Sequence, residues 1–198
     1  QREMLSYIER EPRVLRPLNY SAQAQAPGKG SNVYALPDGR MIGVVQLQGN
    51  VFMKQTLENP FLTVDDVLAD MRLREICDAI IVDMHCEATS EKMAMGHFFD
   101  GKATLVVGTH THIPTNDARI LKSGTGYQTD AGMCGDYDSV IGMNTENSLN
   151  RFLKKNSIKH FPAVGDATLC GVIVDCNIET GLTNNIESYI SGGQLSKT

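Results

Sequence analysis

The chain has 198 residues, of which 41% are hydrophobic and 21% charged, a balance typical of a soluble globular domain with a real core. The formal net charge of −5 at pH 7 argues against a large nucleic-acid footprint, and no apolar run approaches the ~18 residues of a transmembrane helix. No signal-peptide pattern opens the sequence, and five cysteines without C-x-x-C spacing are expected to be reduced thiols of a cytoplasmic protein.

The first half of the chain alternates helical and extended patterns. Apolar residues spaced three to four apart predict helices, and continuous apolar runs predict buried strands. Thr63 and Ser90 stand at the start of two helical patterns and are the expected N-caps. In order, the expected elements are a helix over 2–11, strands over 31–35 and 41–47, a helix from 63, a strand over 79–84, a helix over 90–99 and a strand over 103–107.

The second half is richer in loops and in strands that can pair with one another. The expected elements are a loop over 114–122, a strand over 126–129, a Gly-rich loop over 130–138, a helix over 144–155 capped by Asn144 or Thr145, strands over 168–176 and 186–190, and a frayed tail over 191–198. Helices and strands alternate early and strands pair late, which indicates one α/β domain over 1–198 with a mixed sheet.

Histidines follow two of the predicted buried strands. His85 ends the strand over 79–84, and the run G-T-H-T-H places His110 and His112 after the strand over 103–107. Ligands bind beyond the carboxyl ends of strands in open α/β sheets, and neutral imidazole is the commonest metal ligand in proteins. In an extended chain His110 and His112 would share one side, about 7 Å apart. We therefore predict a metal site, either a mononuclear zinc site or a two-metal phosphoesterase centre.

Several polar residues neighbour these histidines and admit two interpretations. Glu87 and Glu91 either orient a metal-binding imidazole or act as ordinary charges at the start of a helix. Thr109 serves strand-end packing or lies beside the site. Asp130, in the Gly-rich loop, is a candidate for the rim of the site. Cys86 is expected to point to the opposite face of its strand from His85.

The chain resembles the YmdB-like metallophosphoesterases, which belong to the calcineurin-like superfamily. The resemblance spans nearly the whole chain, and H-x-E-A-T-S-E-K together with G-T-H-T-H is a much more specific signal than H-x-H alone. The matching runs are R-P-L-N-Y at 16–20, L-Q-G at 47–49, N-P-F at 59–61, D-M-H-C-E-A-T-S-E-K at 83–92, V-G-T-H-T-H-I-P-T at 107–115 and T-D-A-G-M at 129–133.

This resemblance implies a calcineurin-like sandwich of two mixed β-sheets flanked by helices. It implies hydrolysis of a small phosphodiester, such as a 2′,3′-cyclic nucleotide, by a water activated between two divalent metal ions (Fe, Mn or Zn). By position in the motifs, His85 and His110 would bind one ion and His112 the other. It further implies a bacterial homo-oligomer with a small phosphodiester or nucleotide as its substrate.

The family pattern also contains a segment that we expect to precede this sequence. It carries an Asp after the first strand, a Glu-Asn pair and a G-N-H motif whose His is the proposed general acid. We therefore expect the chain to form the C-terminal two-thirds to three-quarters of the fold, with no assigned catalytic residue. Either the chain alone is inactive, or the missing segment is a separate or further part of the same protein.

Two other interpretations remain open from the sequence. One is a non-catalytic nucleotide-binding or regulatory module with an incomplete metal site. The other is a mononuclear zinc hydrolase of the amidohydrolase type, which would require a (β/α)₈ barrel of about 250 residues.

Overall fold

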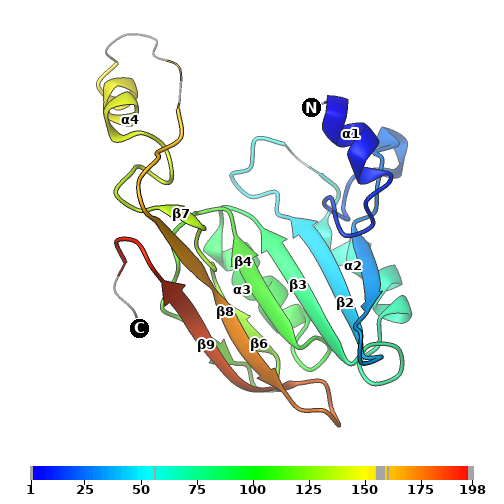
Figure 1. The fold of residues 1–198 in the computed structure, drawn as a ribbon. Coiled ribbons are helices and arrows are strands. Elements are labelled where there is room, and N and C mark those ends of the chain that lie inside the picture. Colours follow the sequence, from blue (N-terminus) through cyan, green and yellow to red (C-terminus); the bar gives the residue numbers. More distant parts are fainter. Residues whose placement is uncertain (1, 56, 155–158, 160, 196–198) are drawn as a thin grey trace.

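A computed structural model describes residues 2–55, 57–154, 159 and 161–195 (Figure 1). None of the helices in these ranges is both long and apolar enough to cross a membrane. The helices are α1 (Arg2–Ile8), a 3-10 turn η1 (Ala22–Ala24), α2 (Pro60–Asp70), α3 (Thr89–Phe98) and α4 (Thr145–Phe152). The strands are β1 (Ser31–Ala35), β2 (Met41–Gln48), β3 (Ala79–His85), β4 (Leu105–Thr109), β5 (Arg119–Ile120), β6 (Gly126–Gln128), β7 (Gly135–Asp136), β8 (Ala167–Cys176) and β9 (Thr183–Ser191).

The strands form two sheets, which confirms the predicted α/β sandwich. The larger sheet has the order β1-β2-β3-β4-β6-β5, and the smaller has the order β7-β8-β9. In the larger sheet β2, β3, β4 and β6 run parallel, whereas the edge strands β1 and β5 run antiparallel. The described strands of the smaller sheet are antiparallel. An open mixed sheet of this kind excludes the (β/α)₈ barrel that the amidohydrolase interpretation requires.

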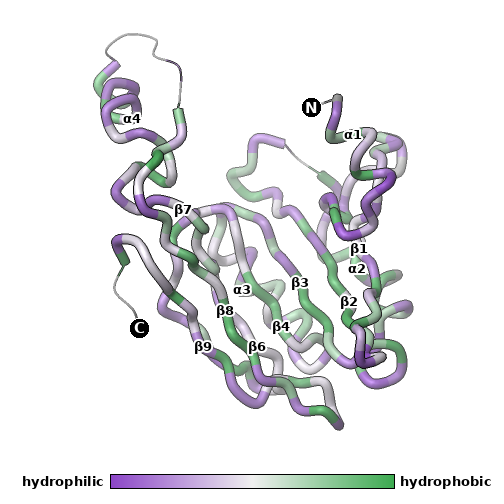
Figure 2. The backbone as a smooth tube through the Cα atoms, in the orientation of Figure 1, coloured by the Kyte–Doolittle hydropathy of each residue, from purple (hydrophilic) through white to green (hydrophobic). Residues whose placement is uncertain are grey.

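The hydrophobic core lies between the larger sheet and the helices α2 and α3, which lie behind it in Figure 1. Alternate residues of β2, β3 and β4 face these helices, and Leu47, Val82 and Val106 are fully buried. Each such side chain contributes roughly 1.5–3 kcal/mol by leaving water. Figure 2 shows the corresponding hydrophobic stretches along the three central strands. Parallel strands buried in this way carry their carboxyl ends to one common edge.

Two threonine hydroxyls fasten the smaller sheet to the larger one. Thr183, at the start of β9, donates to the carbonyl oxygen of Thr104 at 2.6 Å and accepts from the amide of Gly126 at 3.1 Å. Thr104 in turn donates to the carbonyl oxygen of Gly181 at 2.6 Å. Because these groups are buried, their hydrogen bonds fix the register between the sheets.

The predicted N-caps of two helices are wrong. α2 begins three residues before Thr63, because Pro60 occupies its first turn and the Asn59 side chain accepts from the amide of Phe61 at 3.0 Å. α3 begins at Thr89, one residue before the expected cap Ser90, and Ala88 at its N-cap offers no side-chain hydrogen bond. Asn144 is confirmed as the cap of α4, since its side chain accepts from the amide of Asn147.

Other element boundaries differ from prediction where the local pattern was weak. α1 ends at Ile8 rather than at 11, because the amides of Arg10 and Glu11 share the carbonyl oxygen of Tyr7 in a closing turn. The two-residue strands β5 and β7 lie inside segments predicted as loops, and β9 is longer than the expected 186–190. α4 ends at Phe152, and the predicted helix end at 155 and the tail end at 196–198 fall outside the described residues.

Asp117 closes the loop between β4 and β6 and should make stability depend on pH. Burial raises the pKa of its carboxyl group, but hydrogen bonds from Thr115, from Thr129 and from Arg119 outweigh this and hold the pKa below its usual value. A depressed pKa adds stability above about pH 4 that is lost as pH falls through the folded-state value. We expect Asp117→Asn to lower the melting temperature at pH 6 by a few degrees. The difference in melting temperature between the parent protein and the variant should become smaller toward pH 3. Thermal melts in which this difference in melting temperature stays constant with pH would contradict the prediction.

Candidate functional site

The parallel pairing of β3 and β4 brings two predicted histidines into contact. The register places His85 opposite Thr109, so the next residue, His110, lies beside the His85 ring. His85 Nε2 and His110 Nδ1 are 3.2 Å apart, and the rings meet edge to face with centroids 4.9 Å apart. The parallel pairing therefore places the two histidines side by side at the ends of their strands.

The H-T-H run itself is a turn, so the prediction of an extended pair sharing one side is wrong. β4 ends at Thr109, and His110 and His112 then take positive φ angles of 110° and 67°. Such angles are uncommon for residues other than glycine and persist only where the surroundings impose them. Here the carboxylate of Asp130 accepts from the amide of Thr111, at the centre of the turn, at 3.0 Å.

A chain of hydrogen bonds fixes which nitrogen of His85 is available. Thr109 Oγ1 donates to the Asp83 carboxylate at 2.7 Å, so it must accept from His85 Nδ1, 3.0 Å away. His85 Nε2 is then the nitrogen with a free lone pair. Burial lowers the pKa of His85, and nearby His110 and Lys92 lower it further, so the imidazole is neutral at neutral pH.

The Glu87 carboxylate fixes the proton on one ring nitrogen of His110. His110 Nε2 lies 3.2 Å from Glu87 Oε2, a carboxylate that only accepts, so Nε2 carries a proton, and in the neutral ring Nδ1 then carries the lone pair. His85 Nε2 and His110 Nδ1 face each other 3.2 Å apart, a geometry in which a proton or a metal ion can bridge the two nitrogens. Two nitrogen ligands each about 2.0–2.1 Å from one tetrahedral ion lie about 3.3 Å apart. The donor set and spacing of His85 and His110 therefore fit a divalent metal ion.

His112 points to different partners from the other two histidines. Its Nδ1 lies 2.8 Å from the carbonyl oxygen of Ile141, which only accepts, so Nε2 carries the lone pair. In the described part of the chain, no three His, Cys, Asp or Glu side chains form a group that could hold one ion. Because His112 does not form a group with His85 and His110, the arrangement is compatible with ligands for two different ions and does not favour a single three-histidine site.

Asp130 and Lys92 form a fully buried ion pair beneath the H-T-H turn. Lys92 Nζ lies 2.8 Å from Asp130 Oδ2, and the side chains are 0% and 1% exposed. Burial raises the pKa of Asp130, but Lys92 and the amides of Gly132 and Thr111 outweigh this and hold the pKa below its usual value. Asp130 therefore acts on the turn from inside the protein, rather than from a solvent-facing rim.

Sequence reasoning did not identify Lys92 or Asp83 as part of this arrangement. Asp83 had a signal, since a charged residue interrupts the apolar run A-I-I-V-D-M. Burial raises the pKa of its carboxyl group, and the hydrogen bond from Thr109 partly opposes this. Lys92 had none, because lysine is common on helices such as α3 and its burial depends on the distant loop that holds Asp130.

Other residues near the histidines have structural roles. The Glu91 carboxylate accepts from the amides of Asn50 and Val51, so it organises the loop after β2 and does not orient an imidazole. Cys86 is buried on the opposite face, where its thiol donates to the carbonyl oxygen of Ala88 and burial raises its pKa to about 12. His97 is exposed on α3.

Solved structures with the same fold place the chain in a class. A novel phosphatase from Mycoplasma pneumoniae aligns with a TM-score of 0.84 and 33% identity, over 97% of this chain and 68% of that chain. A hypothetical protein from Thermus thermophilus aligns with a TM-score of 0.87 and 39% identity, over 98% of this chain and 73% of that chain. The class that the fold defines is that of phosphoester hydrolases of the metallophosphoesterase type.

The sequence comparisons narrow this class to one family. The family described as YmdB-like protein matches residues 1–189, and the chain belongs to it. A relative from Bacillus subtilis (strain 168), named 2′,3′-cyclic-nucleotide 2′-phosphodiesterase, is 40% identical over 190 residues, which are 96% of this chain and 70% of that protein. The resemblance inferred from the motifs is confirmed.

Proposed function

We propose that the chain supplies the histidine side of a two-metal centre in a phosphodiesterase that hydrolyses small phosphodiesters such as 2′,3′-cyclic nucleotides. The observation that carries this proposal is the pair of ring nitrogens, His85 Nε2 and His110 Nδ1, that face each other 3.2 Å apart. His85 and His110 would hold one divalent ion (Fe, Mn or Zn), and His112 Nε2 a second. The name of the Bacillus relative supports the substrate class.

Bound metal ions would neutralise charge on the phosphoryl oxygens and make water a nucleophile at neutral pH. The residues of this chain prepare for that chemistry in three ways. Thr109 and Asp83 hold the His85 ring with Nε2 outward, and Glu87 does the same for Nδ1 of His110. Such hydrogen-bonded partners fix the tautomer of a ligating histidine and raise its basicity. The buried Asp130 fixes the turn between His110 and His112.

Metal removal from the protein in its full natural length tests the proposal. We expect hydrolysis of 2′,3′-cyclic AMP to a nucleoside monophosphate in the presence of Mn²⁺, a fall of more than about a hundredfold after chelation, and recovery on adding Mn²⁺ back. Elemental analysis should find about two ions per chain before chelation. Full turnover by metal-free protein would contradict the proposal. Nucleotide binding without any turnover would instead support the non-catalytic module.

A further inference from the structure

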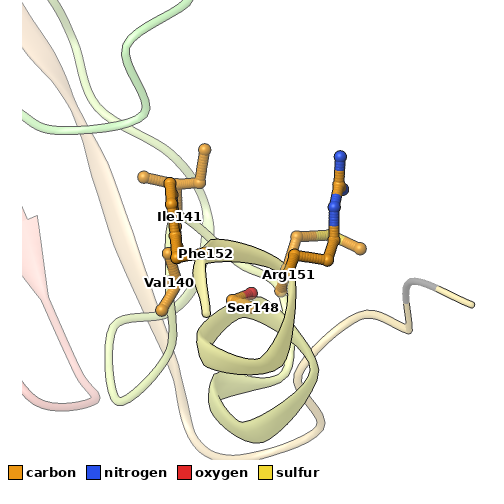
Figure 3. A pocket seen from close by; sticks show the side chains of 6 residues that line it. Val140, Ile141, Ser148, Arg151 and Phe152 are labelled. Carbon is orange, nitrogen blue, oxygen red and sulfur yellow. The ribbon is translucent and has the colours of Figure 1, made fainter. Parts of the chain in front are cut away.

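A cavity of about 320 Å³ lies between α4 and the loop that precedes it (Figure 3). In this view Ser148 lies between Arg151 on one side and the side chains of the loop on the other. The volume of the cavity lies within the range of about 300–1,000 Å³ that is usual for small-molecule pockets. The lining residues are Val140, Ile141, Met143, Ser148, Arg151 and Phe152.

The wall of this cavity is fastened to the candidate metal centre. The carbonyl oxygen of Ile141 accepts from His112 Nδ1 at 2.8 Å, and the hydroxyl of Tyr137 donates to the carbonyl oxygen of His112 at 3.0 Å. Figure 1 shows α4 protruding beyond the edge of the larger sheet at which β3 and β4 end. A molecule held at the histidines therefore has this cavity as its neighbour.

The side chains in the cavity combine a flat apolar surface with a cationic group. Phe152 is 80% exposed although it is aromatic, and its ring has no aromatic or cationic partner in the described part of the chain. Arg151 has no carboxylate partner among residues 2–55, 57–154, 159 and 161–195. Val140 and Ile141 add apolar walls. An aromatic ring stacks on any nucleobase, and a guanidinium donates to the acceptors on a base edge.

We propose that this cavity is the subsite for the base of a nucleotide substrate whose phosphodiester is bound at the histidines. Phe152 stacks on the base, and Arg151 donates to an acceptor on its edge. This inference rests on the proposed function and adds to it a selection for diesters that carry a base. Continuity with His112 favours a substrate over a second copy of the chain as the occupant, because Ile141, which lines the cavity, also accepts from His112 Nδ1.

Two substrates that differ only in the base test the subsite. One is 2′,3′-cyclic AMP, and the other is methyl riboside 2′,3′-cyclic phosphate, in which a methoxy group replaces the base. Turnover of both by the protein in its full natural length is followed by ³¹P NMR. For Phe152→Ala we expect the ratio of the two kcat/KM values, cyclic AMP over methyl riboside, to fall about tenfold. Arg151→Ala is expected to lower the same ratio several-fold.

Leu149→Ala is the matched control, since Leu149 is 52% exposed on the same helix but does not line the cavity. We expect it to leave the ratio unchanged. An unchanged ratio in both Phe152→Ala and Arg151→Ala, with both substrates still hydrolysed, would overturn the subsite alone. No turnover of either substrate by the unaltered protein would overturn the subsite together with the proposed function. A smaller assembly in light scattering with an unchanged ratio would identify the face as an interface between copies, which also overturns the subsite.

Discussion

Replacing His112 by alanine is expected to lower kcat for 2′,3′-cyclic AMP by more than about a thousandfold while the protein stays folded. The variant removes the outward-facing Nε2 that we propose as a ligand of the second ion. His112 is exposed at the end of the turn, so no cavity opens in the core. Elemental analysis of the variant should find about one ion per chain, because His85 and His110 remain. The measurements are steady-state turnover, metal content and a thermal melt.

His112 also anchors the loop before α4, so a second variant must separate the two roles. Asparagine at this position has a side-chain N–H that can donate to the carbonyl oxygen of Ile141, but it has no imidazole. We expect His112→Asn to be nearly as inactive as the alanine variant. His97→Ala, which removes an exposed histidine on α3, should keep full activity. Normal turnover in His112→Ala, or recovery in His112→Asn alone, would contradict the assignment of His112 as a ligand.

The meeting of His85 and His110 was predictable because it follows from topology. Both follow buried apolar runs, and parallel neighbouring strands bring their carboxyl ends to one edge. Asp83 and Thr109 stand close to these histidines in the sequence, and strand pairing brings the two positions side by side. The local sequence therefore contained both the ligands and the groups that orient one of them.

The shape of the H-T-H turn was not predictable from its own residues. Threonine after a β-strand favours continued extension, which is the conformation that the sequence indicated. The turn forms because the carboxylate of Asp130, nineteen positions away, accepts a hydrogen bond from the amide of Thr111. Lys92 of α3 in turn forms an ion pair with Asp130. Whether a lysine is buried depends on such distant partners, so the periodic pattern of residues within α3 does not predict it.

Replacing Lys92 by methionine is expected to lower the free energy of unfolding by about 3–5 kcal/mol. Methionine has a similar length, so little volume is lost, but the Asp130 carboxylate remains buried without its counter-charge. The amides of Thr111 and Gly132 still donate to it, at 3.0 and 2.9 Å, and this keeps the loss within the stated range. Denaturant unfolding, with the slope compared between variant and parent, measures the change.

The double variant Lys92→Met with Asp130→Asn separates the buried charge from lost packing. Asparagine is neutral, so no unpaired charge remains, and its side-chain oxygen can still accept from the amide of Thr111. It cannot also accept from Gly132, because its second polar atom is a donor. We therefore expect the double variant to recover about half of the lost stability. If the loss in free energy of unfolding of the double variant equals the sum of the losses of the two single variants, the two charges act independently. The ion pair would then not explain why the two histidines of the turn keep their positive φ angles.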